Sequence, residues 1–150
     1  MEMTAALSRQ EAMGILARAP GKRLSELFNR EKLPAEGQNL RGPETGLVAL
    51  RGRIGGGGSP FNFGDATVTR ASVKLPTGEI GHAYALGREQ EKVRLCALLD
   101  ALRQRPEHAS RIDSEILQPL RREQEAEDRR QREETAATRV DFFTMTRGED

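Results

Sequence analysis

The sequence has few of the residues that usually build redox, metal or catalytic sites. Its 150 residues include one cysteine, two histidines, one tyrosine and no tryptophan. The single Cys96 excludes an internal disulfide and any metal site made of cysteines alone, and its apolar neighbours predict a small core residue. His82 and His108 lack metal-ligand spacing, and the position of His82 on an expected strand favours a half-buried structural role. We therefore expect this chain to bind no metal and no cofactor.

Neither sign of charge is in excess, and long apolar runs are missing. With 24 basic and 23 acidic residues the net charge is +1, so bulk attraction to nucleic acid is not expected, although a local basic patch remains open. The longest apolar run, residues 95–99, is far too short to span a bilayer. No apolar stretch typical of a secretory signal appears at the N-terminus. These features predict a cytoplasmic protein without a membrane partner.

Phosphate-loop and nucleophile motifs are missing as well. The glycine run at 55–58 continues as Ser59-Pro60, without the lysine of a phosphate loop and without the third glycine of GxGxxG. Ser59 also lacks the strand–turn–helix context of a nucleophile elbow. No spacing joins the carboxylates of Glu44, Asp65 and Asp100 into a catalytic pair. The sequence thus predicts no active site of its own.

The first 36 residues predict a pair of helices. Ser8 and Glu11 have the spacing of a capping box, and a second helix is expected from about Lys22 to Lys32. Two helices joined by a short turn also permit a helix–turn–helix interpretation, in which the basic residues of the second helix contact phosphates. Acidic residues dilute that positive field, so packing of the pair on the sheet or on a partner is favoured.

The middle of the chain predicts a small antiparallel sheet. The expected strands are residues 46–54, 66–75 and 79–86. The last two are joined by a hairpin at Pro76-Thr77-Gly78, and Leu40-Arg41 is a candidate for an additional edge strand. The third strand has Gly81, Ala83 and Ala85 on one face, and such small residues would let a helix pack closely.

The last third predicts a core helix followed by a charged arm. Leucines at 95, 98, 99 and 102 give the core helix, residues 88–104, one apolar face. A narrower apolar stripe continues past Pro106 from Ile112 to Leu120, with a kink expected at Pro119. Three pairs in the charged stretch 121–134 have the i, i+4 spacing of ion pairs: Glu125/Arg129, Asp128/Arg132 and Arg130/Glu134. With one apolar residue in that stretch, we expect it to project, to span a gap or to fray until something binds it.

Together these elements predict a single α+β domain over residues 1–150. A small antiparallel sheet of three to four strands is packed by a core helix, beside an N-terminal helical pair and a long charged C-terminal helix with a docking tail. The expected segments are the helical pair at 1–36, the sheet plus core helix at 40–104, the helical arm at 106–138 and an extended tail at 139–150.

Four of the five phenylalanines fall outside the expected regular elements. Phe61 and Phe63 lie in the glycine-rich loop, and Phe142 and Phe143 lie in the tail. Aromatic residues in such segments are typical of interface anchors. The alternative is that loop and tail fold back over the chain's own sheet, and both interpretations remain open.

Three arginines lie close to glycine-marked loops or strand ends: Arg53, Arg70 and Arg88. Together with backbone amides such as those of Gly55 and Gly56, their guanidinium groups could hold a phosphate or phosphonate. The simpler interpretation, that they are solvated or contact a partner, is favoured.

Several of these segments, in this order, resemble the PhnG family of the carbon–phosphorus lyase core complex. The matching motifs are 43–48 (PETGLV), 53–56 (RIGG), 59–62 (SPFN), 66–70 (ATVTR), 84–88 (YALGR), 100–102 (DAL) and 139–145 (RVDFFTM). The resemblance covers about residues 43–102 and the tail, while the N-terminal helices and the charged helix match only in character.

The resemblance implies a supporting role in phosphonate breakdown. The family assembles in the cytoplasm with three other subunits, two copies of each. With a nucleosidase-type subunit it supports transfer of methylphosphonate to the ribose C1′ of ATP, with release of adenine. This implies a subunit of a transferase, α-D-ribose 1-methylphosphonate 5-triphosphate synthase, without an active site of its own. ATP is then a substrate of the complex, and residues 53–70 and 139–147 are the expected partner surfaces.

Two alternatives remain open. The chain could be a free-standing phosphate- or nucleic-acid-binding module that uses the glycine loop and the neighbouring arginines, in which case the isolated chain would bind ATP or oligonucleotides. It could also complete an ATP or phosphonate site only inside the complex.

Overall fold

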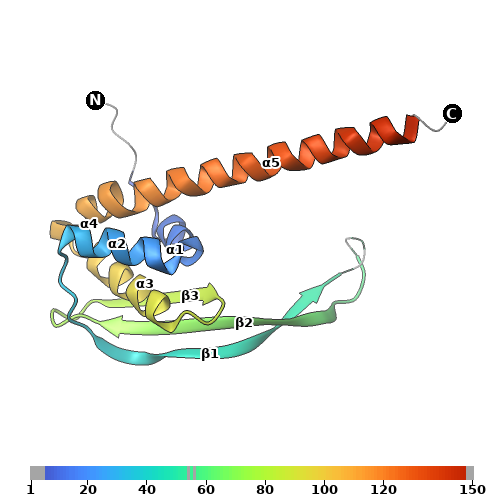
Figure 1. The fold of residues 1–150 in the computed structure, drawn as a ribbon. Coiled ribbons are helices and arrows are strands. Elements are labelled where there is room, and N and C mark those ends of the chain that lie inside the picture. Colours follow the sequence, from blue (N-terminus) through green and yellow to red (C-terminus); the bar gives the residue numbers. More distant parts are fainter. Residues whose placement is uncertain (1–5, 54, 56, 148–150) are drawn as a thin grey trace.

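The computed structural model describes residues 6–53, 55 and 57–147, with side chains described as far as residue 139. The fold has the expected α+β arrangement, with an antiparallel sheet on one side and the helices of the described chain on the other (Figure 1). The helical elements are α1 (Arg9–Arg18), α2 (Gly21–Glu31), α3 (Gln90–Arg103), α4 (Pro106–Ile112), the π-helical turn η1 (Asp113–Leu117) and α5 (Gln118–Arg147). The strands are β1 (Gln38–Gly52), β2 (Phe61–Lys74) and β3 (Ile80–Leu86).

The N-terminal helices form as expected and pack inside the domain. Ser8 caps α1: its hydroxyl accepts from the Glu11 amide at 3.1 Å, and the Glu11 carboxylate accepts from the Ser8 amide at 2.8 Å. Leu24 and Leu27 of α2 are fully buried, and the pair covers α3 on the side away from the sheet (Figure 1). The helix–turn–helix interpretation is therefore not supported, because α2 packs against the body of the domain and Arg23 pairs with Glu123 of α5 at 2.8 Å.

The sheet has the order β1-β2-β3, with both neighbouring pairs antiparallel. The predicted hairpin between β2 and β3 is confirmed, since the Leu75 amide donates to Glu79 O and the Gly78 amide donates to Leu75 O, both at 2.9 Å. The prediction of an additional edge strand is wrong, because Leu40 and Arg41 belong to β1 itself. Irregularities between Asn39 and Glu44 let one long strand continue where the sequence suggests a break.

Helix α3 packs on one face of the sheet through the small residues of β3. A methyl group added at Gly81 would lie 1.9 Å from the Ala97 carbonyl oxygen, so the backbones of β3 and α3 are in direct contact there. Val73 from β2 and Leu99 from α3 are completely buried between the layers. The expected close approach of a helix to this face is confirmed.

The chain turns from α4 into α5 through η1. The predicted apolar stripe is confirmed, since Ile112, Ile116, Leu117 and Leu120 are all buried. Pro119 has no amide hydrogen, so the carbonyl of Glu115 cannot receive the usual bond from four residues ahead. Arg30 of α2 donates to that carbonyl at 3.2 Å instead. The π-helical turn ends at Leu117, two residues before Pro119, and the kink at Pro119 stays a prediction.

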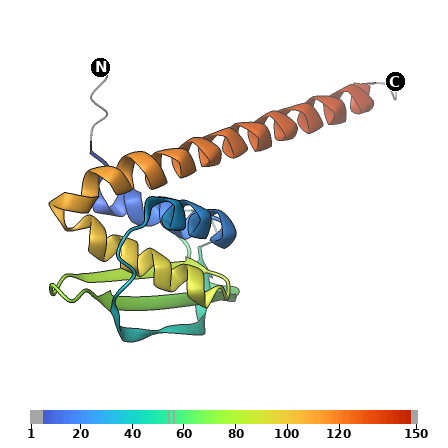
Figure 2. The ribbon, with the colours of Figure 1, turned by 60° about the vertical axis from the view of Figure 1, so that its left-hand side comes forward.

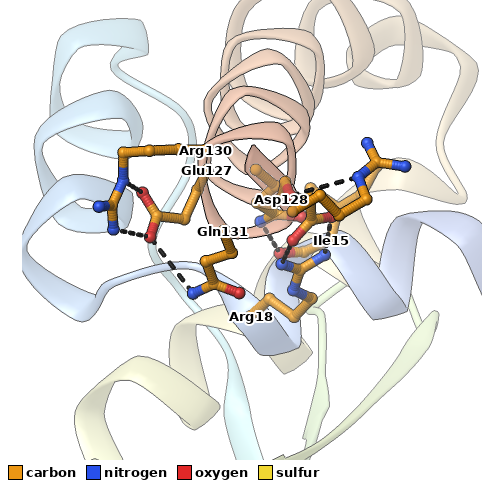
Figure 3. Close-up of polar contacts among 8 residues, drawn as sticks. Ile15, Arg18, Glu127, Asp128, Arg130 and Gln131 are labelled. Atoms are coloured by element: carbon orange, nitrogen blue, oxygen red, sulfur yellow. Dashed lines mark hydrogen bonds and ion pairs between the residues drawn. The ribbon is translucent and has the colours of Figure 1, made fainter. Parts of the chain in front are cut away.

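Only the first half of α5 lies against the body of the domain. Asp128 pairs with Arg18 of α1 at 2.8 Å, and Gln124 donates to the Ile15 carbonyl at 2.9 Å (Figure 3). Beyond these contacts α5 projects away from the other helices (Figures 1 and 2). No helix within the described ranges is long and apolar enough to cross a membrane.

Two details of the predicted C-terminal segments, the charged helix and the tail, differ from the structure. Of the three predicted ion pairs Arg130/Glu134 forms, at 2.6 Å, whereas Asp128 turns to Arg18 and Glu125 pairs with Arg121 at 3.1 Å. The segment 139–147 is helical and not extended, because no glycine or proline interrupts the sequence between Pro119 and residue 148. It therefore lies on α5 and does not fold back over the sheet (Figure 1). The side chains of Phe142 and Phe143 lie outside the described residues.

Strands β1 and β2 continue beyond β3 as a two-stranded arm, residues 47–52 and 61–67. The last residue of β3, Leu86, pairs with Val68, whereas β1 and β2 remain paired as far as Gly52 and Phe61. Phe61 and Phe63 therefore lie in a strand and not in an irregular loop, as their alternation with Asn62 indicates. Figure 1 shows the arm and α5 leaving the body as separate projections.

Candidate interaction surface

The face of the sheet that points away from α3, here called the open face, carries no helix of the described chain (Figures 1 and 2). Its members follow from the pairing, because directly opposed residues of antiparallel strands share a face. They include Glu44, Gly46 and Val48 of β1, Val68, Arg70, Ser72 and Lys74 of β2, and Ile80, His82, Tyr84 and Leu86 of β3.

Exposed apolar side chains gather on the sheet. Within the described part of the chain, every exposed large apolar residue belongs to a strand: Leu40, Leu47, Leu50, Phe61, Phe63, Ile80, Tyr84 and Leu86. On the open face Leu86 is 75% exposed and Tyr84 is 52% exposed. A group of exposed apolar residues of this size marks an interaction surface more often than an isolated one does. The sheet is therefore the best candidate for the functional surface.

A hollow lies in the middle of the open face. Gly46 and Val68 are directly paired at its base, and Val48, Tyr84 and Arg70 stand around it. A methyl group added at Gly46 would meet no atom within 4 Å, so the missing side chain leaves open space. Val68 is 6% exposed but does not belong to the contiguous core beneath α3. The hollow, here called the socket, is thus an open depression of mixed lining, with apolar side chains at its base and the charged pair of Glu44 and Arg70 at its edge.

Polar cross-strand pairs lie on the open face. Arg70 Nε donates to Glu44 Oε1 at 2.6 Å at the edge of the socket, and farther along the face Ser72 Oγ lies 2.8 Å from His82 Nδ1. The Ser72–His82 pair has the composition of a nucleophile and its base, but Asp100 does not orient the imidazole. Asp100 instead accepts a hydrogen bond from the backbone amide of His82 at 2.9 Å, on the α3 side of the sheet. The arrangement stabilises the strands and does not form a catalytic triad.

The arm carries the two aromatic residues expected to contact a partner. The Phe61 and Phe63 ring centroids are 6.0 Å apart with a 57° tilt, and Phe63 lies against Gly52. A two-stranded ribbon without a third layer is marginally stable in water, so these rings are well placed to be covered by another chain. At the tip the Gly58 amide donates to Gly55 O at 3.1 Å, which closes a tight turn, while Gly56 lies outside the described residues.

The three candidate arginines are not brought together. Arg53 follows β1 at the tip of the arm, Arg70 lies in the middle of the sheet, and Arg88 lies between β3 and α3. At roughly 3.3 Å per residue, the stretch of β2 from Phe61 to Arg70 alone spans about 30 Å. A single phosphate site made from Arg53 and Arg70 is therefore not assembled within this chain.

The structure gives a role to two buried residues, Asp100 and Cys96, for which the sequence motifs indicated no function. Asp100, 4% exposed, accepts from Arg9 and from the His82 amide, so its role is to join α1, α3 and β3. Its signal in the sequence is one carboxylate inside the apolar run of the core helix. The Cys96 thiol donates to Leu16 O at 3.4 Å, and burial raises its pKa to about 12. The predicted core role of Cys96 is confirmed.

Comparison with known proteins points to one family. Residues 7–148 match the family model described as phosphonate metabolism protein PhnG. A relative from Rhizobium meliloti (strain 1021), named α-D-ribose 1-methylphosphonate 5-triphosphate synthase subunit PhnG, is 51% identical over 142 residues. That alignment covers 95% of this chain and 90% of the relative.

Proposed function

The chain belongs to the PhnG family, and from this premise we propose that it is an accessory, noncatalytic subunit of α-D-ribose 1-methylphosphonate 5-triphosphate synthase in organic phosphonate catabolism. The observation that carries the proposal is the 51% identity to a synthase subunit over 95% of the chain. At this identity and coverage the surface that relatives use for assembly is expected to be retained.

The role of the chain in the reaction is to support other subunits. In the proposed assembly the complex transfers methylphosphonate to the ribose C1′ of ATP and releases adenine, and the nucleosidase-type subunit is the main partner. ATP is a substrate of this complex, so the proposal places the assembly in the cytoplasm. The exposed apolar residues of the sheet and arm fit a subunit that is covered when it assembles.

The structure offers little support for the alternative of a free-standing phosphate- or nucleic-acid-binding module. Arg53 lies at the tip of the arm and Arg70 in the middle of the sheet, and Arg70 is already paired with Glu44. Two other groups with catalytic potential are also engaged: Asp100 is bonded to Arg9, and the Cys96 thiol is buried.

Genetic complementation tests the proposal. The gene is placed in a bacterium whose own PhnG subunit has been deleted, and growth is measured with methylphosphonate as the sole phosphorus source. We expect growth to be restored, with phosphate as the control source on which both strains grow equally. Failure to restore growth while the chain is present in soluble form would contradict the proposed function.

A further inference from the structure

The open face of the sheet combines a socket, an apolar rim and a net positive charge. The socket lies over Gly46 and Val68, and Tyr84 and Leu86 provide exposed apolar surface beside it. Pockets that lose all contact with water when a partner's side chain fills them are where binding energy concentrates in protein interfaces. We propose that this socket receives an apolar side chain of another synthase subunit, an inference that rests on the proposed function.

Charge identifies the kind of partner. By register Arg41 lies beside Ser72 on the open face, and Lys74 lies beside Ile80. Together with Arg70, these cations outnumber Glu44, which is already paired with Arg70. We therefore expect the partner subunit to carry carboxylates that face Arg41 and Lys74. These carboxylates surround the partner's apolar side chain that enters the socket.

The same charges argue against a second copy of this chain. Two open faces placed against each other would oppose like charges at Arg41 and Lys74. The chain's own C-terminal helix is also an unsuitable occupant, since α5 leaves the domain on the opposite side from the open face (Figures 1 and 2). A different chain with an acidic rim remains as the occupant.

Gly46 allows a test in which the fold is left intact. Its backbone is not in the left-handed region, and a Cβ atom added there meets no atom of this chain within 4 Å. Gly46→Leu therefore places an apolar side chain over the socket from a position with open space at Cβ, and leucine suits a strand better than glycine does. Gly14→Leu is the matched control, because Gly14 lies on α1 and a Cβ atom added there also meets nothing within 4 Å.

The experiment measures binding of the purified chain to the remaining synthase subunits, expressed together without it. We expect Gly46→Leu to weaken binding at least about tenfold and Gly14→Leu to leave it unchanged. Lys74→Glu is expected to weaken binding as well, and the wild-type interaction is expected to weaken with salt. Circular dichroism of each variant verifies that it is folded. If Gly46→Leu is misfolded, Leu86→Glu replaces it, since that side chain is 75% exposed.

The outcomes separate this inference from the proposed function. If the wild-type chain does not bind the other subunits, the proposed function fails. If the wild-type chain binds and folded Gly46→Leu binds equally well, the socket is not the docking site and the inference is overturned while the function stands. Dimerisation of the isolated chain that Gly46→Leu abolishes would identify a second copy as the occupant, which also overturns the inference.

Discussion

The guanidinium group of Arg9 forms two hydrogen bonds with the buried carboxylate of Asp100, at 3.0 Å from Nε and at 2.7 Å from Nη2. Asp100 also accepts the His82 amide, so one side chain joins α1, α3 and β3. The helical layer and the sheet therefore have a fixed relation behind the open face. The interaction surface depends on this relation although Asp100 does not lie on it.

Asp100→Asn should destabilise the domain. The amide cannot accept all three hydrogen bonds, and the loss of charge weakens the pair with Arg9. Because Arg9 is 51% exposed, we expect a loss of about 1–3 kcal/mol in the free energy of unfolding, below the cost of breaking a fully buried ion pair. Urea unfolding measures the change. Arg9→Ala is the companion variant, and a change of less than about 0.5 kcal/mol for Asp100→Asn would show that the pair is not important for stability.

Gly81→Ala should displace α3 from the sheet. The new methyl group would lie 1.9 Å from Ala97 O and 2.5 Å from the Ala101 amide nitrogen, and backbone atoms cannot move aside as a flexible side chain can. We expect a loss of roughly 1–3 kcal/mol or more, measured by thermal or urea unfolding. Gly46→Ala is the control, since its added methyl group meets nothing within 4 Å. Equal stability of both variants would contradict the close packing of β3 and α3.

The Cys96 thiol should be unreactive in the folded chain. Burial raises its pKa to about 12, so almost no thiolate exists at pH 8. We expect alkylation by iodoacetamide to be slow in the native state and fast in urea, as followed by mass spectrometry. A raised thiol pKa contributes stability below the ordinary value of 9.0, and this contribution is lost as the pH rises toward 12. Rapid alkylation without denaturant would contradict the burial of Cys96.

Acid should loosen the contact between α5 and α1. The hydrogen bonds from Arg18 hold the pKa of Asp128 below its ordinary value of 3.8. The pair is therefore fully formed above pH 3.8, and its contribution is lost as the pH falls through the lowered pKa. We expect Asp128→Asn to lower the unfolding temperature slightly at pH 7 and this difference from the wild type to shrink as the pH falls below 3.8.

Glu134→Gln is the control for this prediction, because the partner of Glu134, Arg130, belongs to α5 itself and does not join the helix to the body. An Asp128→Asn effect that persists unchanged in acid would show that the Arg18 pair is not its cause.

Local patterns predicted much of the fold because their causes are local. The Ser8–Glu11 cap and the Pro76-Thr77-Gly78 hairpin depend on neighbouring residues, and both form as expected. The small residues of β3 also indicated the helix packing. Because Gly81 has no side chain, the backbone of α3 can approach the strand closely at this position. The family resemblance added the function, which neither composition nor periodicity could supply.

The parts that sequence analysis missed depend on tertiary partners. Asp128 has Arg132 at helical spacing but binds Arg18 of another helix, and no local pattern decides between these two cations. The socket over Gly46 appears only when β1 and β2 are paired, because Val68 lies at its base. The helical form of residues 139–147 could have been found from the absence of glycine and proline, but the apolar residues there suggested a separate tail.

Co-expression of this chain with the other subunits of the synthase, followed by native mass determination, tests the central claim most directly. The account predicts that the chain is recovered in a stoichiometric complex with those subunits, and that the complex retains it through size exclusion. A well-behaved monomer recovered apart from an otherwise assembled complex would contradict the assignment of this chain as a subunit.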